Sequence, residues 1–152
     1  MANYCRSPTA EGVFRARVQR AGLVDSLRID SAGTHDYRIG DQPDPRSAAF
    51  AARRGYDLSA MRARQVNDAD FDAFDHILAM DNNNLAFLTK VCPPQYRHKL
   101  GLLMQYAKRA DSDIVPDPYQ GDDGGFDLVL DYIEDASDGL LDHLRNHHTE
   151  TV

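Results

Sequence analysis

Three features that would assign a chain to a special class of protein are scarce or missing here. Only two cysteines are present, Cys5 and Cys92, which is too few for a disulfide framework and favours a reducing, cytoplasmic location. No apolar run approaches the roughly 18 residues of a membrane-spanning helix, and the N-terminal stretch has no hydrophobic signal-peptide segment. Basic residues number 17 against 24 acidic ones, which argues against a nucleic-acid-binding or membrane-binding surface. An anionic substrate would therefore need a local positive site.

The composition that remains is that of an ordinary soluble domain. Hydrophobic residues make up 42% and charged residues 27% of the 152 positions. A chain of this length buries about 70% of its unfolded surface on folding, enough for one complete core. We therefore expect residues 1–152 to form a single domain.

Strand-like and helix-like segments alternate along the chain. Strands are predicted in three segments: within residues 26–34, where a short strand leads into a Ser-Gly turn, and over residues 75–81 and 99–107. Helices are predicted over residues 8–21, 44–55 and 81–90 and from residue 125 onward, where apolar residues recur at helical spacing. This alternation favours an α/β fold with a small parallel sheet flanked by helices. Ligands of such folds bind at the carboxyl ends of the strands.

The first predicted helix begins with residues suited to binding an anion. Ser7 fits the N-cap, Pro8 fits the first helical position, and Gly22 fits the end of the helix. A helix N-terminus offers unpaired N–H groups and a partial positive charge. Arg6 would add a planar fork of donors for phosphate oxygens. A capped surface helix beside a solvated arginine explains the same three residues, so this motif alone does not decide.

The wider sequence closely resembles one family of enzymes. The opening "NYCRSPTAEGVFR" resembles the signature of the low-molecular-weight protein tyrosine phosphatases of bacterial type. Five further segments match that family in order: "DSAGT", "IGDQPDPR", "RARQV", "FDHILAMDNNNL" and "VPDPYQG". The resemblance spans nearly the whole chain. It implies the low-molecular-weight phosphatase fold, with a phosphate loop at a helix N-terminus, and hydrolysis of phosphotyrosine monoesters through a phosphocysteine.

The family's nucleophile has no counterpart among these residues. It is the first cysteine of Cys-x5-Arg, and neither Cys5 nor Cys92 is followed by arginine six positions later. The position six before Arg6 precedes Met1. We therefore expect the nucleophile and the family's first strand to lie upstream of a misplaced start. A natural loss, which would leave the chain without catalysis, is the alternative.

The resemblance assigns roles to the remaining site residues. Arg6 and Asp117 would be catalytic, with Asp117 as the general acid that protonates the leaving phenolate. Ser31 would support the phosphate loop, and Tyr37 and Tyr119 would line the substrate pocket. The residues that would bind phosphate are Asn3, Tyr4, Cys5, Arg6 and Ser7.

No metal or cofactor is expected, because the six histidines are scattered and the resemblance implies none. The expected partners are a phosphotyrosine protein or a small aryl phosphate, with inorganic phosphate as product and neither nucleic acid nor membrane. Two alternatives stay open. One is a phosphate-binding or phosphoprotein-binding pseudophosphatase, and the other is a protein-arginine phosphatase. The second is less favoured, because the family resemblance implies a threonine in arginine phosphatases at the position where this chain has Tyr4.

Overall fold

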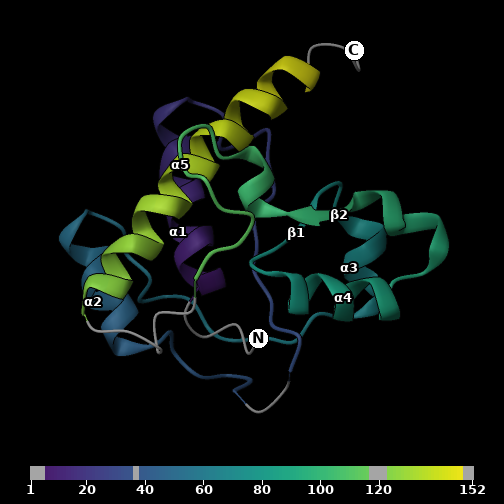
Figure 1. Ribbon diagram of the computed structural model, residues 1–152, viewed down its shortest axis with the longest axis horizontal. Coiled ribbons are helices and arrows are strands. Elements are labelled where there is room, and N and C mark those ends of the chain that lie inside the picture. Colours follow the sequence, from purple (N-terminus) through teal and green to yellow (C-terminus); the bar gives the residue numbers. More distant parts are fainter. Residues whose placement is uncertain (1–5, 36–37, 117–122, 149–152) are drawn as a thin grey trace.

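A computed structural model of the protein describes residues 6–35, 38–116 and 123–148. Figure 1 shows α1, α2 and α5 gathered on one side of the view, and α3 and α4 with the two strands on the other. The elements in chain order are α1 (Arg6–Arg20), α2 (Pro45–Arg53), α3 (Asp68–Ala73), β1 (Ile77–Ala79), α4 (Asn82–Val91), η1 (Pro94–Lys99), β2 (Leu100–Leu102), η2 (Leu103–Tyr106) and α5 (Asp123–His148).

The four long helices confirm the predictions from apolar spacing and differ from them mainly at their ends. Helix α1 begins at Arg6, so Ser7 lies inside the first turn and the prediction that it is the N-cap is wrong. Local sequence rarely fixes the first residue of a helix to better than about two positions. The ends set by glycine are more exact, because Gly22 and Gly55 take the left-handed conformation with φ of 75° and 89°.

Caps explain where α2 and α4 begin. Asp44 precedes α2, and its Oδ2 accepts a hydrogen bond from the amide of Ser47 at 3.0 Å. Pro45 occupies the first turn, where its missing N–H costs nothing. Asp81 precedes α4 in the same way and accepts from the amide of Asn84 at 2.8 Å.

Strands β1 and β2 form the small parallel sheet that the sequence predicted. Ile77 pairs with Leu100 and Ala79 with Leu102. The third predicted strand is shorter than expected, because the chain turns into η2 directly after β2.

The strand predicted over residues 26–34 is wrong for the part of the chain that the structure describes. Only Gly33 makes a bridge, with Gln65. A strand needs a ladder along its length, but here Ile29 gives its carbonyl to the side chain of Arg15. Gly33 donates its amide to the carbonyl of Arg64 and accepts from the amide of Val66, which makes a single bridge rather than a ladder.

The sheet separates two hydrophobic clusters, because alternate residues of β1 point to opposite faces. Leu78, and Met80 just after the strand, pack with the large cluster formed by α1, α2 and α5. Ile77 and Ala79 pack with the smaller cluster, which Phe71 of α3 and Leu88 of α4 complete. This two-sided burial holds the carboxyl end of β1 between the two groups of helices. Among the described residues, no helix is long and apolar enough to cross a membrane.

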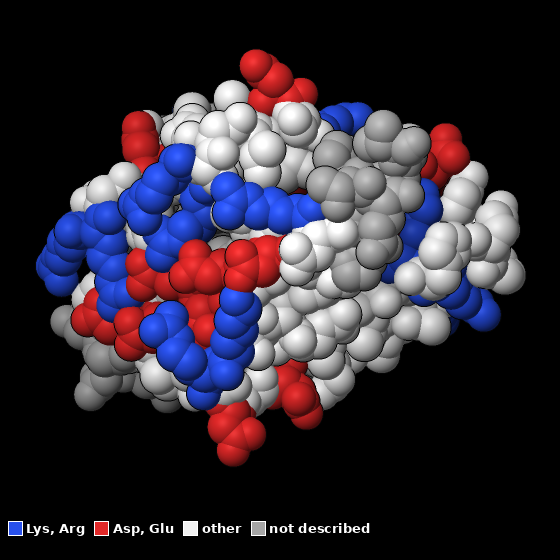
Figure 2. Space-filling view, turned by 90° about the horizontal axis from the view of Figure 1, so that it is seen from above, with Lys and Arg blue, Asp and Glu red and all other residues white. Residues whose placement is uncertain are grey.

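Acidic and basic side chains interleave on the face where α1, α2 and α5 meet (Figure 2). Arg54, just after α2, bonds through Nη1 to Asp131 at 2.9 Å and to Glu134 at 2.5 Å. Arg17 of α1 bonds to Asp138 at 2.7 Å and to the hydroxyl of Tyr56 at 3.0 Å. These pairs connect α1 and the end of α2 to α5. Several carboxylates of α5 therefore have cationic partners.

Candidate active site

Arg6 is held in one orientation at the first turn of α1. The residue is only 9% exposed. Its Nη1 donates to the carbonyl oxygen of Val115 at 2.7 Å, and its Nη2 lies 2.9 Å from Oδ2 of Asp81. These contacts use two of the five donors of the guanidinium. The guanidinium is therefore a fixed charge rather than a solvated one, and the explanation of Arg6 as an exposed helix-start arginine is wrong.

Asp81 joins the end of β1 to the start of α4. One carboxylate oxygen caps α4 through the amide of Asn84, and the other faces Arg6. Partial burial raises the pKa of Asp81, but the amide bond and the Arg6 guanidinium outweigh it and hold that pKa below its usual range. Asp81 is therefore ionised at neutral pH, when it pairs with Arg6.

Val115 brings a third segment to the same place. The residue is fully buried, and its amide donates to the carbonyl of Met80 at 2.8 Å. Its own carbonyl accepts from Arg6. The start of α1, the carboxyl end of β1 and the segment before residue 117 therefore meet at one point, where α/β folds place their ligands.

This arrangement is suited to an oxyanion. The N-terminal turn of α1 supplies backbone donors and the positive end of a helix dipole. Arg6 adds a guanidinium whose direction is already set by Asp81 and Val115, so little side-chain entropy is lost on binding. Such a site binds the phosphoryl group of a monoester and stabilises the charge that develops during its transfer.

The supporting residue Ser31 lies beside α1. Its hydroxyl donates to Oε1 of Glu11 at 2.6 Å, and Oε2 of Glu11 accepts from Arg15 at 2.8 Å. These bonds fix Ser31 near the first turns of α1, on which Ser7 also lies. Six of the predicted site residues lie outside the described residues: Asn3, Tyr4, Cys5, Tyr37, Asp117 and Tyr119.

Cys92 is not placed to act as a nucleophile. It is 3% exposed and belongs to the smaller hydrophobic cluster behind β1. Burial raises the pKa of its thiol, which opposes formation of the reactive thiolate. Within the described ranges, no group of three or more His, Cys, Asp or Glu side chains could hold a metal ion.

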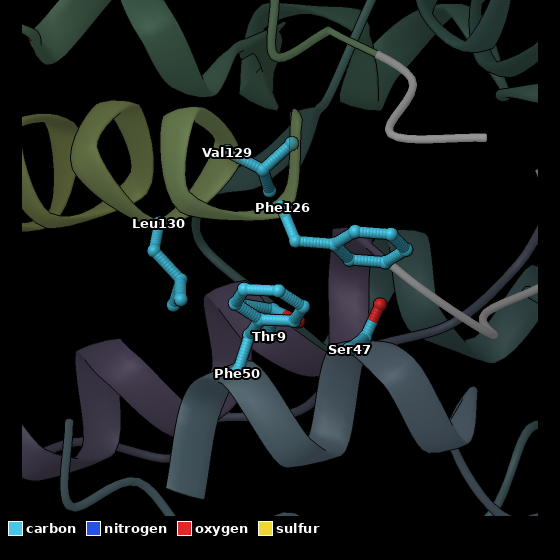
Figure 3. A pocket seen from close by; sticks show the side chains of 6 residues that line it. All are labelled: Thr9, Ser47, Phe50, Phe126, Val129 and Leu130. Carbon is cyan, nitrogen blue, oxygen red and sulfur yellow. The ribbon is translucent and has the colours of Figure 1, made fainter. Parts of the chain in front are cut away.

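A small hollow lies between α1, α2 and α5 (Figure 3). Phe50 and Phe126 stack across it with ring centroids 5.2 Å apart. Arg46 lies over the ring of Phe126 and Arg53 over the ring of Phe50, each 4.6 Å from the ring centroid. The ring stack and the contact of Arg46 with Phe126 join the first turns of α5 to α2. The residues that line the hollow are Thr9, Ser47, Phe50, Phe126, Val129 and Leu130.

Sequence reasoning did not identify two groups that hold Arg6. Asp81 carried a usable signal, because an aspartate between a buried strand and a helix start lies at the edge where α/β proteins bind ligands. The carbonyl of Val115 carried none, because any residue provides the same backbone oxygen.

Comparison with known proteins agrees with this geometry. The family model for low molecular weight phosphotyrosine protein phosphatase matches residues 1–150. A low molecular weight protein-tyrosine-phosphatase of Streptomyces coelicolor is 42% identical over 94% of this chain and 88% of its own length. The crystal structure of a protein tyrosine phosphatase from Entamoeba histolytica is 38% identical with a TM-score of 0.94, covering 97% of this chain and 94% of that one.

A third similar structure is a Drosophila arginine phosphatase, 33% identical with a TM-score of 0.85 over 94% of this chain and 92% of that one. Its similarity confirms the fold and shows that the fold also occurs in a protein named for another substrate. With the family model matching nearly every residue, the chain belongs to the low molecular weight phosphotyrosine protein phosphatases.

Proposed function

We propose that the protein hydrolyses phosphotyrosine monoesters, on proteins or as small aryl phosphates, and releases inorganic phosphate. The observation that carries this proposal is the buried Arg6, fixed by Asp81 and by the Val115 carbonyl at the N-terminus of α1. Family membership supports the reaction class. The assignment of roles to individual residues rests on their match to the family signature.

The reaction would proceed in two steps. A cysteine thiolate six positions before Arg6, which the 152 residues do not contain, attacks phosphorus and forms an S–P bond as the P–O bond to the phenol breaks. Asp117 gives its proton to the departing phenolate oxygen. The Asp117 carboxylate then takes a proton from water, whose oxygen attacks phosphorus, and the S–P bond breaks to release phosphate and the thiolate.

Arg6 and the loop amides of residues 2–7 would bind the equatorial phosphoryl oxygens through both steps. Asn3, Tyr4, Cys5 and Ser7 belong to this loop, and Ser31 would support it. Tyr37 and Tyr119 would enclose the phenyl ring of the substrate from two sides.

We also infer that residues 1–152 act as one domain, since the family model spans nearly all of them. A cytoplasmic location is supported by the presence of only two cysteines.

An arginine phosphatase is the second candidate, supported by the similarity to the Drosophila structure. Tyr4, where threonine is expected in such enzymes, favours phosphotyrosine. Turnover of phosphotyrosine and phosphoarginine peptides would separate the two, and preference for phosphoarginine would overturn the first proposal. Binding of both peptides without turnover would instead support a pseudophosphatase.

The role of Asp117 is tested in a cysteine-containing form of the protein. This form carries the matching segment of a relative in front of residue 1, so that a cysteine lies six positions before Arg6. Asp117→Asn should lower turnover of phenyl phosphate by about 10²–10³, because the poor leaving group needs the proton. Phosphates of acidic phenols should lose much less. An equal loss on all substrates would show that Asp117 is not the acid.

A further inference from the structure

Asp135 of α5 is a buried carboxylate that bonds to backbone rather than to a side-chain cation. The residue is 5% exposed. Its Oδ1 accepts from the amide of Lys108 at 3.1 Å, and its Oδ2 accepts from the amides of Arg109 at 2.9 Å and Ala110 at 2.7 Å. The side chain of Arg109 is largely exposed and its Nε lies 3.7 Å from Oδ1, so it contributes little. Asp135 therefore fixes three consecutive peptide groups.

The same face of α5 makes two further contacts with this segment. Gly139 lies one turn after Asp135, and a Cβ built there would be 1.7 Å from the carbonyl oxygen of Tyr106. Asp142 follows and pairs with the ammonium of Lys108. Positions spaced by four and three residues lie on one side of a helix. This stripe of α5 thus holds the beginning of the segment that follows η2.

The other end of that segment reaches Arg6. Five residues after Ala110 comes Val115, whose amide bonds to Met80 and whose carbonyl accepts from the guanidinium. Between the two ends, Ser112 bonds to Ile114 at 2.9 Å and closes a local turn. The segment is therefore fixed at both ends, on α5 by Asp135 and at the oxyanion site by Met80 and Arg6.

We propose that Asp135 is a positioning residue for Arg6, acting through residues 108–115. This inference rests on the proposed function, in which Arg6 grips the phosphoryl oxygens. The Val115 carbonyl can orient the guanidinium only if residues 108–115 are held in one position along α5. The three amide bonds to Asp135 fix that position. Errors of about 1 Å in such an arrangement weaken recognition even when every group is present.

The test is binding of inorganic phosphate by the protein, measured by isothermal titration calorimetry, which needs no turnover. Asp135→Asn keeps the shape of the side chain but turns an NH2 group toward amides that also donate. We expect about fivefold weaker phosphate binding, the equivalent of one lost hydrogen bond. The matched control is Asp131→Asn on the same helix, an exposed carboxylate that pairs with Arg54 rather than with residues 108–115, and it should leave binding unchanged.

Arg6→Ala separates a positioning role from a general loss of fold. If Asp135 acts through Arg6, the double variant Arg6→Ala/Asp135→Asn should bind phosphate no more weakly than Arg6→Ala alone. Additive losses, or unchanged affinity in a folded Asp135→Asn protein, would overturn the inference. Should Asp135→Asn not fold in a thermal melt, Asp135→Glu, which keeps the charge but displaces it, is judged by the same criteria.

Failure of the proposed function has a different signature. If phosphate binding by the unaltered protein did not depend on Arg6, the oxyanion site itself would be wrong, whatever the Asp135 variants did. If binding depended on Arg6 but not on Asp135, only the positioning role would be wrong.

Discussion

Arg6 and its partners show how far single residues can be interpreted from sequence. The Arg-Ser-Pro motif predicted an anion site, which stays a prediction, and Arg6 itself is buried rather than solvated. Asp81 was not recognised as a site residue, because its contact with Arg6 joins positions 75 residues apart. Local patterns do not encode such a pairing, although the capping role of Asp81 was visible in the sequence.

Removing the charge of Asp81 should weaken the oxyanion site. Asparagine is also a good N-cap, so Asp81→Asn preserves α4 while Arg6 loses its ionic partner. We expect about tenfold weaker phosphate binding, because Arg6 loses the charge-assisted contact that orients it, and this loss outweighs the relief of repulsion between the Asp81 carboxylate and the phosphate. Calorimetric titration of phosphate would measure this. The control Asp44→Asn changes the cap of α2, where the carboxylate bonds to the amide of Ser47 rather than to Arg6, and should have no effect; an equal loss in both variants would contradict the assignment.

Asp135 should contribute to the loss of stability in acid. Burial raises the pKa of this carboxyl, but the three amide bonds lower it further, so its folded-state pKa lies below the usual value. The unfolded state then binds the proton more readily, and the stabilisation is complete well above about pH 3.9 and declines as pH falls through that value toward the folded-state pKa. Asp135→Asn should therefore flatten the pH dependence of the free energy of unfolding.

Urea unfolding at several values between about pH 3 and pH 7 would measure that slope. The control Leu128→Ala changes an exposed side chain of the same helix and should keep the slope. An unchanged slope in Asp135→Asn would show that the amide bonds do not favour the ionised carboxyl.

At the scale of elements, helices were predictable and strands less so. Apolar spacing and the glycines at 22 and 55 are local signals, and they located α1, α2, α4 and α5. The segment over residues 26–34 has the composition of a strand, but a strand also requires neighbours, which composition does not reveal. The short helices α3 and η1 were not predicted, because six residues carry too little periodicity.

Gly139 should be essential for the packing of α5 against η2. The Cβ of an alanine there would meet the carbonyl oxygen of Tyr106 at 1.7 Å, and a backbone atom cannot move aside as a side chain can. Gly139→Ala should lower the free energy of unfolding by roughly 1–3 kcal/mol despite the better helix propensity of alanine. Urea denaturation would measure it against Leu128→Ala, which should stay within about 0.5 kcal/mol of the unaltered protein. A neutral or stabilising Gly139→Ala would contradict the close packing.

At the scale of the whole molecule, the fold explains why the oxyanion site lies where it does. The sheet separates two clusters of apolar side chains, and the carboxyl end of β1 emerges between them. The sequence predicted this class of fold from alternating elements, because α/β proteins have few ways to cover a small parallel sheet. It could not predict that residues 106–110 would pack on α5. The buried Asp135 that binds this segment leaves the apolar spacing of α5 unchanged, so the sequence does not mark it as a buried residue.

Turnover of an aryl phosphate tests the proposed catalytic site most directly. The cysteine-containing form should hydrolyse the substrate, whereas the 152-residue chain should be slower by a factor on the order of 10⁶, because neither Cys5 nor the buried Cys92 can replace the nucleophile. Cysteine-to-serine replacement in the longer form should abolish its activity in the same way. If the 152-residue chain turned over substrate at nearly the rate of the longer form, another residue would have to be the nucleophile and the proposed mechanism would be wrong.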